Sequence, residues 1–324
     1  MTDDIHLIDL YRARQRLRGH VLHTPLVRSP SLSAHTGGEV HLKLECRQIT
    51  GSFKLRGATN ALLCLDDDAR ARGVVAMSTG NHGRALAHAA HRLGVRAVIC
   101  MSKLVPSNKV EAIRALGAEV HIVGKSQDEA EVEVARLIRD EGLTLLPPFD
   151  HADIIAGQGT VGLELLDDLP DLDTVLVPLS GGGLLAGVAL ALKRASPRIR
   201  VIGVTMERGC AMHASLAAGK PVQVEELETL ADSLGGGIGL DNRYTFRMAQ
   251  TLVDEVVLVS EDEIATAIRH AYAHDQVVTE GSGAVGIAAL LASRVTGTGT
   301  TAVLVSGSNI DMALHRRIVC AQEH

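Results

Sequence analysis

Short apolar runs alternate with amphipathic segments along most of the chain. Several runs are apolar at nearly every position, as expected of strands that are covered on both faces of a sheet. Between them, apolar residues recur at helical spacing. The expected strands are 39–44, 74–77, 97–101, 120–123, 174–177, 201–204, 255–259 and 302–305. The expected helices are 81–93, 107–116, 126–141, 157–168, 183–195 and 261–275, with one more after the candidate caps Thr2 and Asp3.

This alternation of strands and helices predicts an α/β fold with mostly parallel sheets. The 324 residues are 46% hydrophobic, which is ample for more than one domain. No linker rich in proline, serine or charge interrupts the chain. We therefore expect two lobes of one enzyme in preference to two independent modules.

Composition narrows the classes of partner. The net charge is −6 with acidic and basic residues interspersed, and aromatic residues make up 2% of the chain with no tryptophan. This composition argues against nucleic acid or a membrane surface as the main partner. No apolar run reaches the roughly 18 residues of a membrane span. The five cysteines form no CxxC pair and the N-terminus is acidic, which favours reduced thiols in a cytoplasmic protein.

A glycine-rich string follows the strand expected at 174–177. Three glycines at a junction between a strand and a helix can turn successive backbone N–H groups toward an anion, which the helix dipole also attracts. A tight turn is the simpler alternative. Neither a P-loop lysine nor a GxSxG motif is present, so a nucleotide P-loop and a hydrolase nucleophile at Ser180 are both disfavoured. The string consists of Ser180, Gly181, Gly182, Gly183 and Leu184.

Polar residues also follow two other expected strands. Ser78-Thr79-Gly80-Asn81-His82-Gly83 leads into a helix and offers hydroxyls, an amide, an imidazole and N–H groups, a set that suits a carboxylate. Capping of that helix by Ser78, Thr79 or Asn81 is the alternative. Ser306 ends the last strand, where a simple turn would be the default explanation. Ligands bind at such carboxyl ends in open parallel sheets.

Lys54 stands in an unusual string, Gly51-Ser52-Phe53-Lys54-Leu55-Arg56-Gly57, at the start of a helical pattern. A lysine amine can form a Schiff base with an aldehyde, and a flat aromatic neighbour can pack beside a flat cofactor. No histidine or acidic cluster has metal-ligand spacing. We interpret Asp66-Asp67-Asp68 as a solvated helix end, and we predict no metal site.

Taken in order, these strings resemble the fold-type II pyridoxal-phosphate enzymes, specifically the group of serine/threonine dehydratases and serine racemases. The resemblance spans nearly the whole chain, and the Ser-Phe-Lys-x-Arg-Gly-Ala string is its most specific part. It also includes Thr24-Pro25-Leu26, Ala156-Gly157-Gln158-Gly159-Thr160, Glu280-Gly281-Ser282-Gly283 and Ser306-Gly307-Ser308-Asn309.

The resemblance implies a role for each candidate residue. Lys54 would bind the cofactor covalently and act as the catalytic base, and Phe53 would lie beside the pyridine ring. Asn81 would bond the phenolic oxygen of the cofactor, and Ser306 would bond the ring nitrogen. The phosphate would be held by Ser180, Gly181, Gly182, Gly183 and Leu184. The substrate carboxylate would be bound by Ser78, Thr79 and His82.

The same resemblance implies a two-domain architecture like that of the tryptophan synthase β subunit. We expect a large cofactor-binding domain of residues 1–72 plus 149–324 and a small substrate-side domain of residues 73–148. We also expect a homodimer that acts on a small molecule. The expected reaction is β-elimination, a dehydration and deamination of a hydroxy amino acid, because a neutral serine at the ring nitrogen favours elimination over transamination.

Three departures leave alternatives open. Thr79 stands where racemases of the group carry a serine, so an amino-acid racemase remains an alternative. Thr205 and Ala211 replace the acidic pair that binds a divalent cation in relatives. Pro147-Pro148-Phe149 differs from the more polar His-Pro-Asn stretch of some relatives, and the pattern looks closest to the branch of hydroxyectoine-utilisation dehydratases. A pyridoxal-phosphate-binding protein without turnover is the second alternative.

Overall fold

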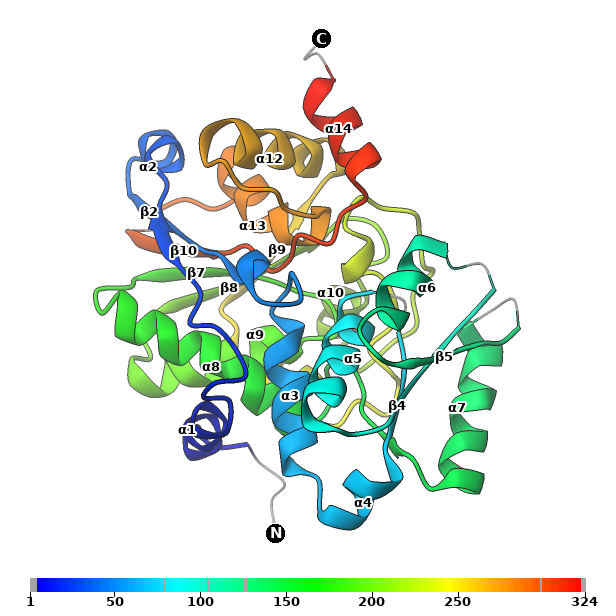
Figure 1. The fold of residues 1–324 in the computed structure, drawn as a ribbon. Coiled ribbons are helices and arrows are strands. Elements are labelled where there is room, and N and C mark those ends of the chain that lie inside the picture. Colours follow the sequence, from blue (N-terminus) through cyan, green and yellow to red (C-terminus); the bar gives the residue numbers. More distant parts are fainter. Residues whose placement is uncertain are drawn as a thin grey trace.

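The strands form two separate sheets, both flanked by helices (Figure 1). The computed structural model describes residues 5–78, 80–103, 105, 107–124, 127–297 and 299–321. The larger sheet contains, in spatial order, β1 (Leu26–Arg28), β2 (Glu39–Lys43), β10 (Thr300–Leu304), β7 (Thr174–Pro178), β8 (Arg200–Met206) and β9 (Glu255–Val259). The smaller sheet contains β5 (Glu119–Ile122), β4 (Ala97–Met101), β3 (Val74–Met77) and β6 (Thr144–Leu145).

All strand pairs in these sheets are parallel except β1 with β2, which confirms the predicted α/β class. The strands of the smaller sheet all come from within residues 73–148. The division into domains at 72/73 and 148/149 remains a prediction.

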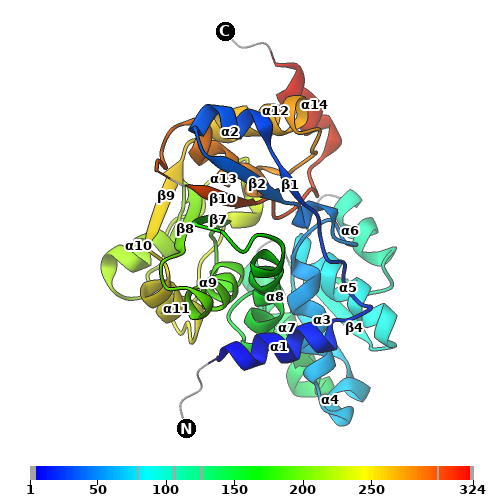
Figure 2. The same cartoon turned by 90° about the vertical axis from the view of Figure 1, so that its left-hand side faces the viewer.

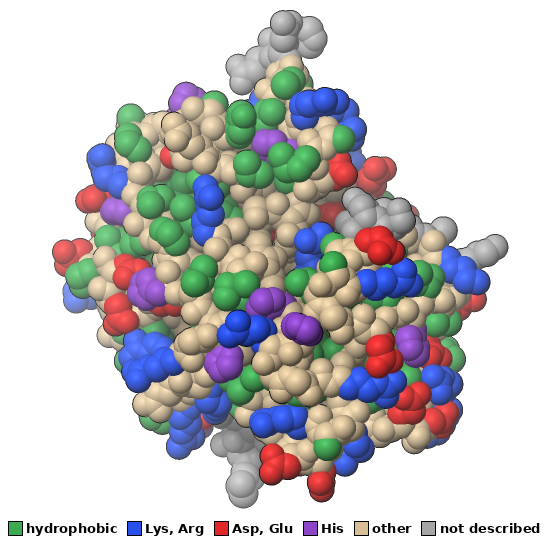
Figure 3. Space-filling model, in the orientation of Figure 1, with side chains coloured by type: hydrophobic (Ala, Val, Ile, Leu, Met, Phe, Trp, Pro, Cys, Tyr) green, Lys and Arg blue, Asp and Glu red, His purple; other side chains and the backbone are tan. Residues whose placement is uncertain are grey.

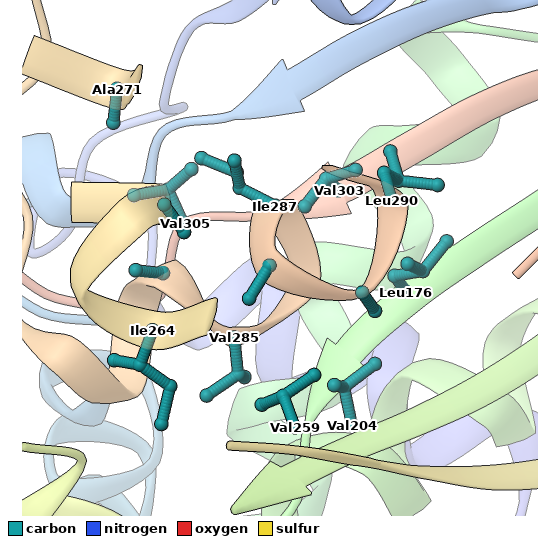
Figure 4. Close-up of a cluster of buried hydrophobic side chains, with 14 of the residues drawn as sticks. Leu176, Val204, Val259, Ile264, Ala271, Val285, Ile287, Leu290, Val303 and Val305 are labelled. Carbon is teal, nitrogen blue, oxygen red and sulfur yellow. The ribbon is translucent and has the colours of Figure 1, made fainter. Parts of the chain in front are cut away.

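Helices cover both faces of the larger sheet (Figure 2). On one face, α13 (Gly281–Leu291) packs on the strands and α12 (Glu261–His274) packs on α13. On the other face lie α9 (Gly183–Ala195) and α8 (Ala152–Asp168). Side chains along β7 alternate between the two faces: Leu176 packs with α12 and α13, and Val175 packs with α8 and α9. Figure 4 shows the core between α13 and the sheet, where Val285, Ile287 and Leu290 of α13 pack near Leu176 and Val303. Every residue of β7 is buried, as predicted for a strand covered on both faces.

The smaller sheet is covered in the same way. The face of the sheet that carries Ala76 and Ile99 packs on α5 (Asn81–Leu93), and the face that carries Val75 and Val98 packs on α7 (Gln127–Glu141). Helix α3 (Lys54–Cys64) contacts both α5 and α8 and so joins the two halves. The remaining helices are α1 (Leu7–Arg16), α2 (Pro30–Thr36), η1 (Glu45–Arg47), α4 (Asp67–Arg72), α6 (Ser107–Arg114), α10 (Ala211–Ala218), η2 (Asp232–Leu234), α11 (Thr245–Leu252) and α14 (Met312–Cys320).

The expected strands are all present, with ends that shift by up to two residues. Helix α8 starts at Ala152, five residues before the expected start at 157. Three glycines in this helix interrupt the helical spacing of apolar residues, so its first turn was not recognised. The packing of the helix shows why glycine is needed there. A Cβ on Gly157 would lie 2.7 Å from Gly57 Cα, so the glycine allows α8 to approach α3 closely. Asp66 is the N-cap residue of α4, where its carboxylate accepts a hydrogen bond from the N–H of Ala69, which agrees with its interpretation as a helix end.

Two surface properties follow from the side chains. On the face shown in Figure 3, acidic and basic side chains are interspersed among apolar ones. Within the part of the chain that the structure describes, no helix is both long and apolar enough to cross a membrane.

Candidate active site

One pocket lies beyond the carboxyl ends of β7 and β10 in the larger sheet. It brings together every residue predicted to bind the cofactor, although these residues come from four separate stretches of sequence. The lining also contains residues for which the sequence predicted no role. The pocket is lined by Phe53, Lys54, Asn81, Phe149, Pro178, Ser180, Gly181, Gly182, Gly183, Leu184, Ser233, Leu234, Glu280, Ser282 and Ser306.

Lys54 is the first residue of α3, and the start of this helix is fixed to the end of β10. The N–H of Phe53 donates to the carbonyl of Ser306 at 3.1 Å. The Lys54 amine Nζ donates to the carbonyl of Pro148 at 2.7 Å. Burial lowers the pKa of this amine from 10.5 to about 8, because an ammonium ion is poorly solvated there. A substantial fraction of the amine is therefore neutral at a pH slightly above the physiological value, and the neutral amine is the nucleophilic form.

This lowered pKa can be measured on the protein without cofactor. Reductive methylation with ¹³C-formaldehyde labels the lysine amines, and loss of one resonance in Lys54→Ala assigns that of Lys54. We expect its chemical shift to titrate with a midpoint near pH 8, with the protonated form below and the neutral form above. A midpoint near the ordinary lysine value of about 10.4 would show that burial does not activate the amine.

A buried ionic network anchors Arg56 in the first turn of α3, the helix that begins at Lys54. The Arg56 guanidinium is 1% exposed and donates to the carboxylate of Glu45 at 2.7 and 2.9 Å. It also donates to Glu164 of α8, whose Oε2 lies 2.8 Å from Lys43 Nζ. Arg56 is two residues after Lys54, so these bonds anchor the backbone that presents the amine.

The glycine-rich string forms the turn between β7 and α9. Its N-cap residue is Gly182, with φ of 89°, a left-handed conformation that favours glycine. Glycine has no side chain to accept from the first-turn N–H groups of α9, so these groups can bind an anion. A Cβ on Gly181 would overlap the ring of Phe149. This geometry suits a site for a phosphate, and a simple tight turn would not need all of these features.

A buried carboxylate that the sequence did not single out lies beside Asn81. Glu280 is 4% exposed, and its Oε1 accepts from Asn81 Nδ2 at 2.7 Å. Its Oε2 accepts from the N–H of Asn309 at 3.0 Å. Asn309 Nδ2 also donates to Asn81 Oδ1 at 2.6 Å, which fixes the Asn81 amide. Ser282 also faces the pocket, and its buried hydroxyl has no hydrogen-bond partner among the described residues. The only sequence signal for either residue was the Glu280–Gly283 string.

Two of the predicted substrate-binding residues, Ser78 and His82, lie near the start of α5, close in sequence to the pocket residue Asn81. Ser78 Oγ accepts from the N–H of Gly83 at 3.0 Å, which is the capping contact considered from the sequence. His82 is buried, and its Nε2 donates to the carbonyl of Leu146 at 2.9 Å. Burial, reinforced by the charge of Lys54, lowers the pKa of His82 to about 3, so its imidazole is neutral. Thr79 lies outside the described residues. The roles of all three toward substrate remain predictions.

The places considered for a metal hold other contacts. Thr205 Oγ1 donates to the sulfur of Met206, and Ala211 begins α10. Among the described residues, no cluster of three or more His, Cys, Asp or Glu side chains could hold a metal ion. All five cysteines are free.

Comparison with known proteins gives a consistent match. The sequence profile of a family described as "Pyridoxal-phosphate dependent enzyme" matches residues 17–307. A putative threonine dehydratase of Sinorhizobium fredii is 60% identical, over 98% of this chain and 96% of that protein. The L-threonine ammonia-lyase of Thermotoga maritima is 42% identical, over 97% and 78% respectively. The solved structure of maize serine racemase superposes with a TM-score of 0.92 at 35% identity, covering 97% of this chain and 96% of that one.

Proposed function

Because the chain belongs to the fold-type II family of pyridoxal-phosphate-dependent enzymes, we propose that it is an ammonia-lyase that eliminates water from L-threonine or L-serine. The relatives named threonine dehydratase and L-threonine ammonia-lyase support this reaction. The observation that carries the proposal is the Lys54 amine, whose pKa is lowered by desolvation and which shares one pocket with the glycine loop and Ser306.

The chemistry of the pocket fits the cofactor, pyridoxal phosphate. Lys54 supplies an amine that can condense with an aldehyde, and the loop from Ser180 to Leu184 offers N–H groups to a phosphate. Ser306 would bond the ring nitrogen, Asn81 the phenolic oxygen, and Phe53 would lie beside the ring. The Asn81 amide is already oriented by Glu280 and Asn309.

When bound, pyridoxal phosphate supplies an aldehyde that exchanges amines and a ring that accepts the electron pair released at the α-carbon. Lys54 would take the α-proton of the substrate as a neutral amine. The C–O bond at the β-carbon would break, and the hydroxyl would leave as water with a proton that balances the one taken up by Lys54. The unsaturated amine product would hydrolyse to a 2-oxo acid and ammonium. Phe53, Phe149 and Leu234 line the pocket and help to exclude solvent from these steps.

A substrate screen tests this proposal. The purified holoenzyme is assayed with both enantiomers of threonine and serine and with hydroxyectoine, which represents the branch that the sequence pattern resembles. Formation of 2-oxo acid is followed by a coupled reductase. We expect turnover of L-threonine or L-serine to exceed that of the other compounds. A protein that binds pyridoxal phosphate but releases neither 2-oxo acid nor ammonium from any of them is the non-catalytic alternative.

Racemisation is a second candidate, favoured by the likeness to maize serine racemase. For this test the reaction is run in deuterated water, and the remaining amino acid is separated by enantiomer and analysed for deuterium by mass spectrometry. In a two-face mechanism, Thr79→Ala abolishes that labelled product and spares elimination. Equal loss of both reactions, or of neither, argues against Thr79 as the second acid/base group.

We also propose that the protein is a cytoplasmic homodimer with the domain division 1–72 plus 149–324 and 73–148. Sedimentation analysis of the holoenzyme tests the dimer, and limited proteolysis near residues 72 and 148 tests the boundaries.

A further inference from the structure

The chain crosses from the smaller sheet to the larger one between β6 and α8. Residues 146–150, which we call the crossover segment, form this connection next to the pocket. Each part of it makes a contact with a different element of the site. From the sequence, this stretch was notable only because Pro147-Pro148-Phe149 is less polar than the His-Pro-Asn stretch of some relatives.

Two carbonyls of the crossover segment accept hydrogen bonds from site side chains. The carbonyl of Leu146 accepts from His82 Nε2 at 2.9 Å, and that of Pro148 accepts from Lys54 Nζ at 2.7 Å. The segment therefore connects helix α5 to the catalytic amine.

Phe149 packs directly on the glycine loop. Its ring occupies the space that a Cβ on Gly181 would need, and its Cα and carbonyl oxygen lie 3.0 Å from the Cβ position of Gly183. Phe149 thus packs against both Gly181 and Gly183 of the glycine loop.

Asp150 ties this segment to a third element. Its carboxylate accepts from the N–H groups of Arg243, Tyr244 and Thr245 at 2.6, 2.9 and 2.9 Å. These groups lie at the start of α11: Thr245 is its first residue, and Tyr244 is its N-cap residue, which makes no side-chain cap. Asn242 Oδ1 accepts from the next N–H, that of Phe246. The carboxylate therefore caps a helix nearly a hundred residues away, with the favourable interaction between an anion and a helix N-terminus.

The start of α11 supports the glycine loop from another side. The Cβ of Thr245 lies 3.0 Å from the Cβ position of Gly182. The glycine loop is therefore packed between Phe149 and Thr245. Asp150, the residue after Phe149, accepts a hydrogen bond from the N–H of Thr245 and so joins these two supports.

We propose that Asp150 is a positioning residue for cofactor binding. By joining Phe149 to the start of α11, it holds the glycine loop in the shape that presents N–H groups to the cofactor phosphate. The inference rests on the proposed roles of Lys54 and the glycine loop. It adds a residue that does not itself line the pocket.

The test compares two ligands that differ only in the phosphate. Protein without cofactor, as wild type and as Asp150→Ala, is titrated with pyridoxal phosphate and with pyridoxal, and lysine-bound aldehyde is followed by absorbance. We expect Asp150→Ala to weaken binding of pyridoxal phosphate about tenfold or more, since bonds to a charged group are lost, and to affect pyridoxal much less. Asp66→Ala is the matched control, because it removes another carboxylate that accepts from a backbone N–H, at α4.

The outcomes separate the inference from the proposed function. If wild type binds no pyridoxal phosphate, the proposed function fails. If wild type binds it and Asp150→Ala weakens both ligands equally, or neither, the positioning role is wrong and the function stands. Circular dichroism checks folding. Should Asp150→Ala not fold, Asp150→Asn gives the same comparison, because the amide keeps the shape and one acceptor but loses the charge.

Discussion

Lys54→Ala is expected to remove the visible absorption of lysine-bound pyridoxal phosphate and to lower the rate of 2-oxo acid formation by at least about 10³-fold. The variant loses both the covalent attachment of the cofactor and the base that takes the α-proton. His82 is a poor replacement, because burial lowers the pKa of its imidazole and its Nε2 is bonded to the carbonyl of Leu146. Absorbance and a coupled 2-oxo acid assay measure the two effects.

Lys220→Ala is the control, since Lys220 is an exposed lysine outside the pocket. It should leave spectrum and rate unchanged. A small primary amine added to Lys54→Ala should restore part of the rate if proton transfer is what the variant lacks. Retention of the wild-type rate by Lys54→Ala would contradict the assignment of this residue as base.

Arg56→Met is expected to lower the free energy of unfolding by about 3–5 kcal/mol. The methionine keeps much of the side-chain volume but leaves Glu45 and Glu164 buried without their shared guanidinium. Glu45 is 0% exposed and Glu164 is 7% exposed, so water cannot compensate for the lost charge. Urea denaturation of wild type and variant, followed by circular dichroism, measures the difference.

The pH dependence of this effect has a definite sign. In the wild type, Arg56 and Lys43 hold the pKa of Glu164 below its usual value despite burial, so the carboxylate stabilises the fold at neutral pH and loses that contribution on acidification. Without Arg56, burial instead favours the protonated acid. The gap in stability between wild type and variant should therefore widen as pH rises from acidic to neutral.

Arg96→Met provides the comparison for Arg56→Met, because Arg96 pairs with Glu119 and Glu141 on the surface. The partly exposed Arg96 network should contribute no more than about 1 kcal/mol. Equal losses in the two variants would show that the buried network does not anchor α3.

Much of the fold was predictable from local patterns. Apolar runs and helical spacing report which residues face a core, and they placed the main strands and the helices between them. Helix α13 was not predicted, because it is buried along nearly its whole length and so has no polar face to reveal a period. The short strands β1 and β6 carry too few residues for an alternation to be recognised.

The main groups of the site could be found from local sequence, because the string around Lys54, the glycine loop and the polar residues after strands are each recognisable from their neighbours in the chain. The distant groups that support them became visible only in the folded chain. Glu280 orients Asn81 across 199 positions, and Asp150 caps a helix 95 positions away. Such partners are chosen by strand order and helix packing, which bring the groups together in space. A hydrogen bond acts over about 3 Å of space, whatever the separation along the chain.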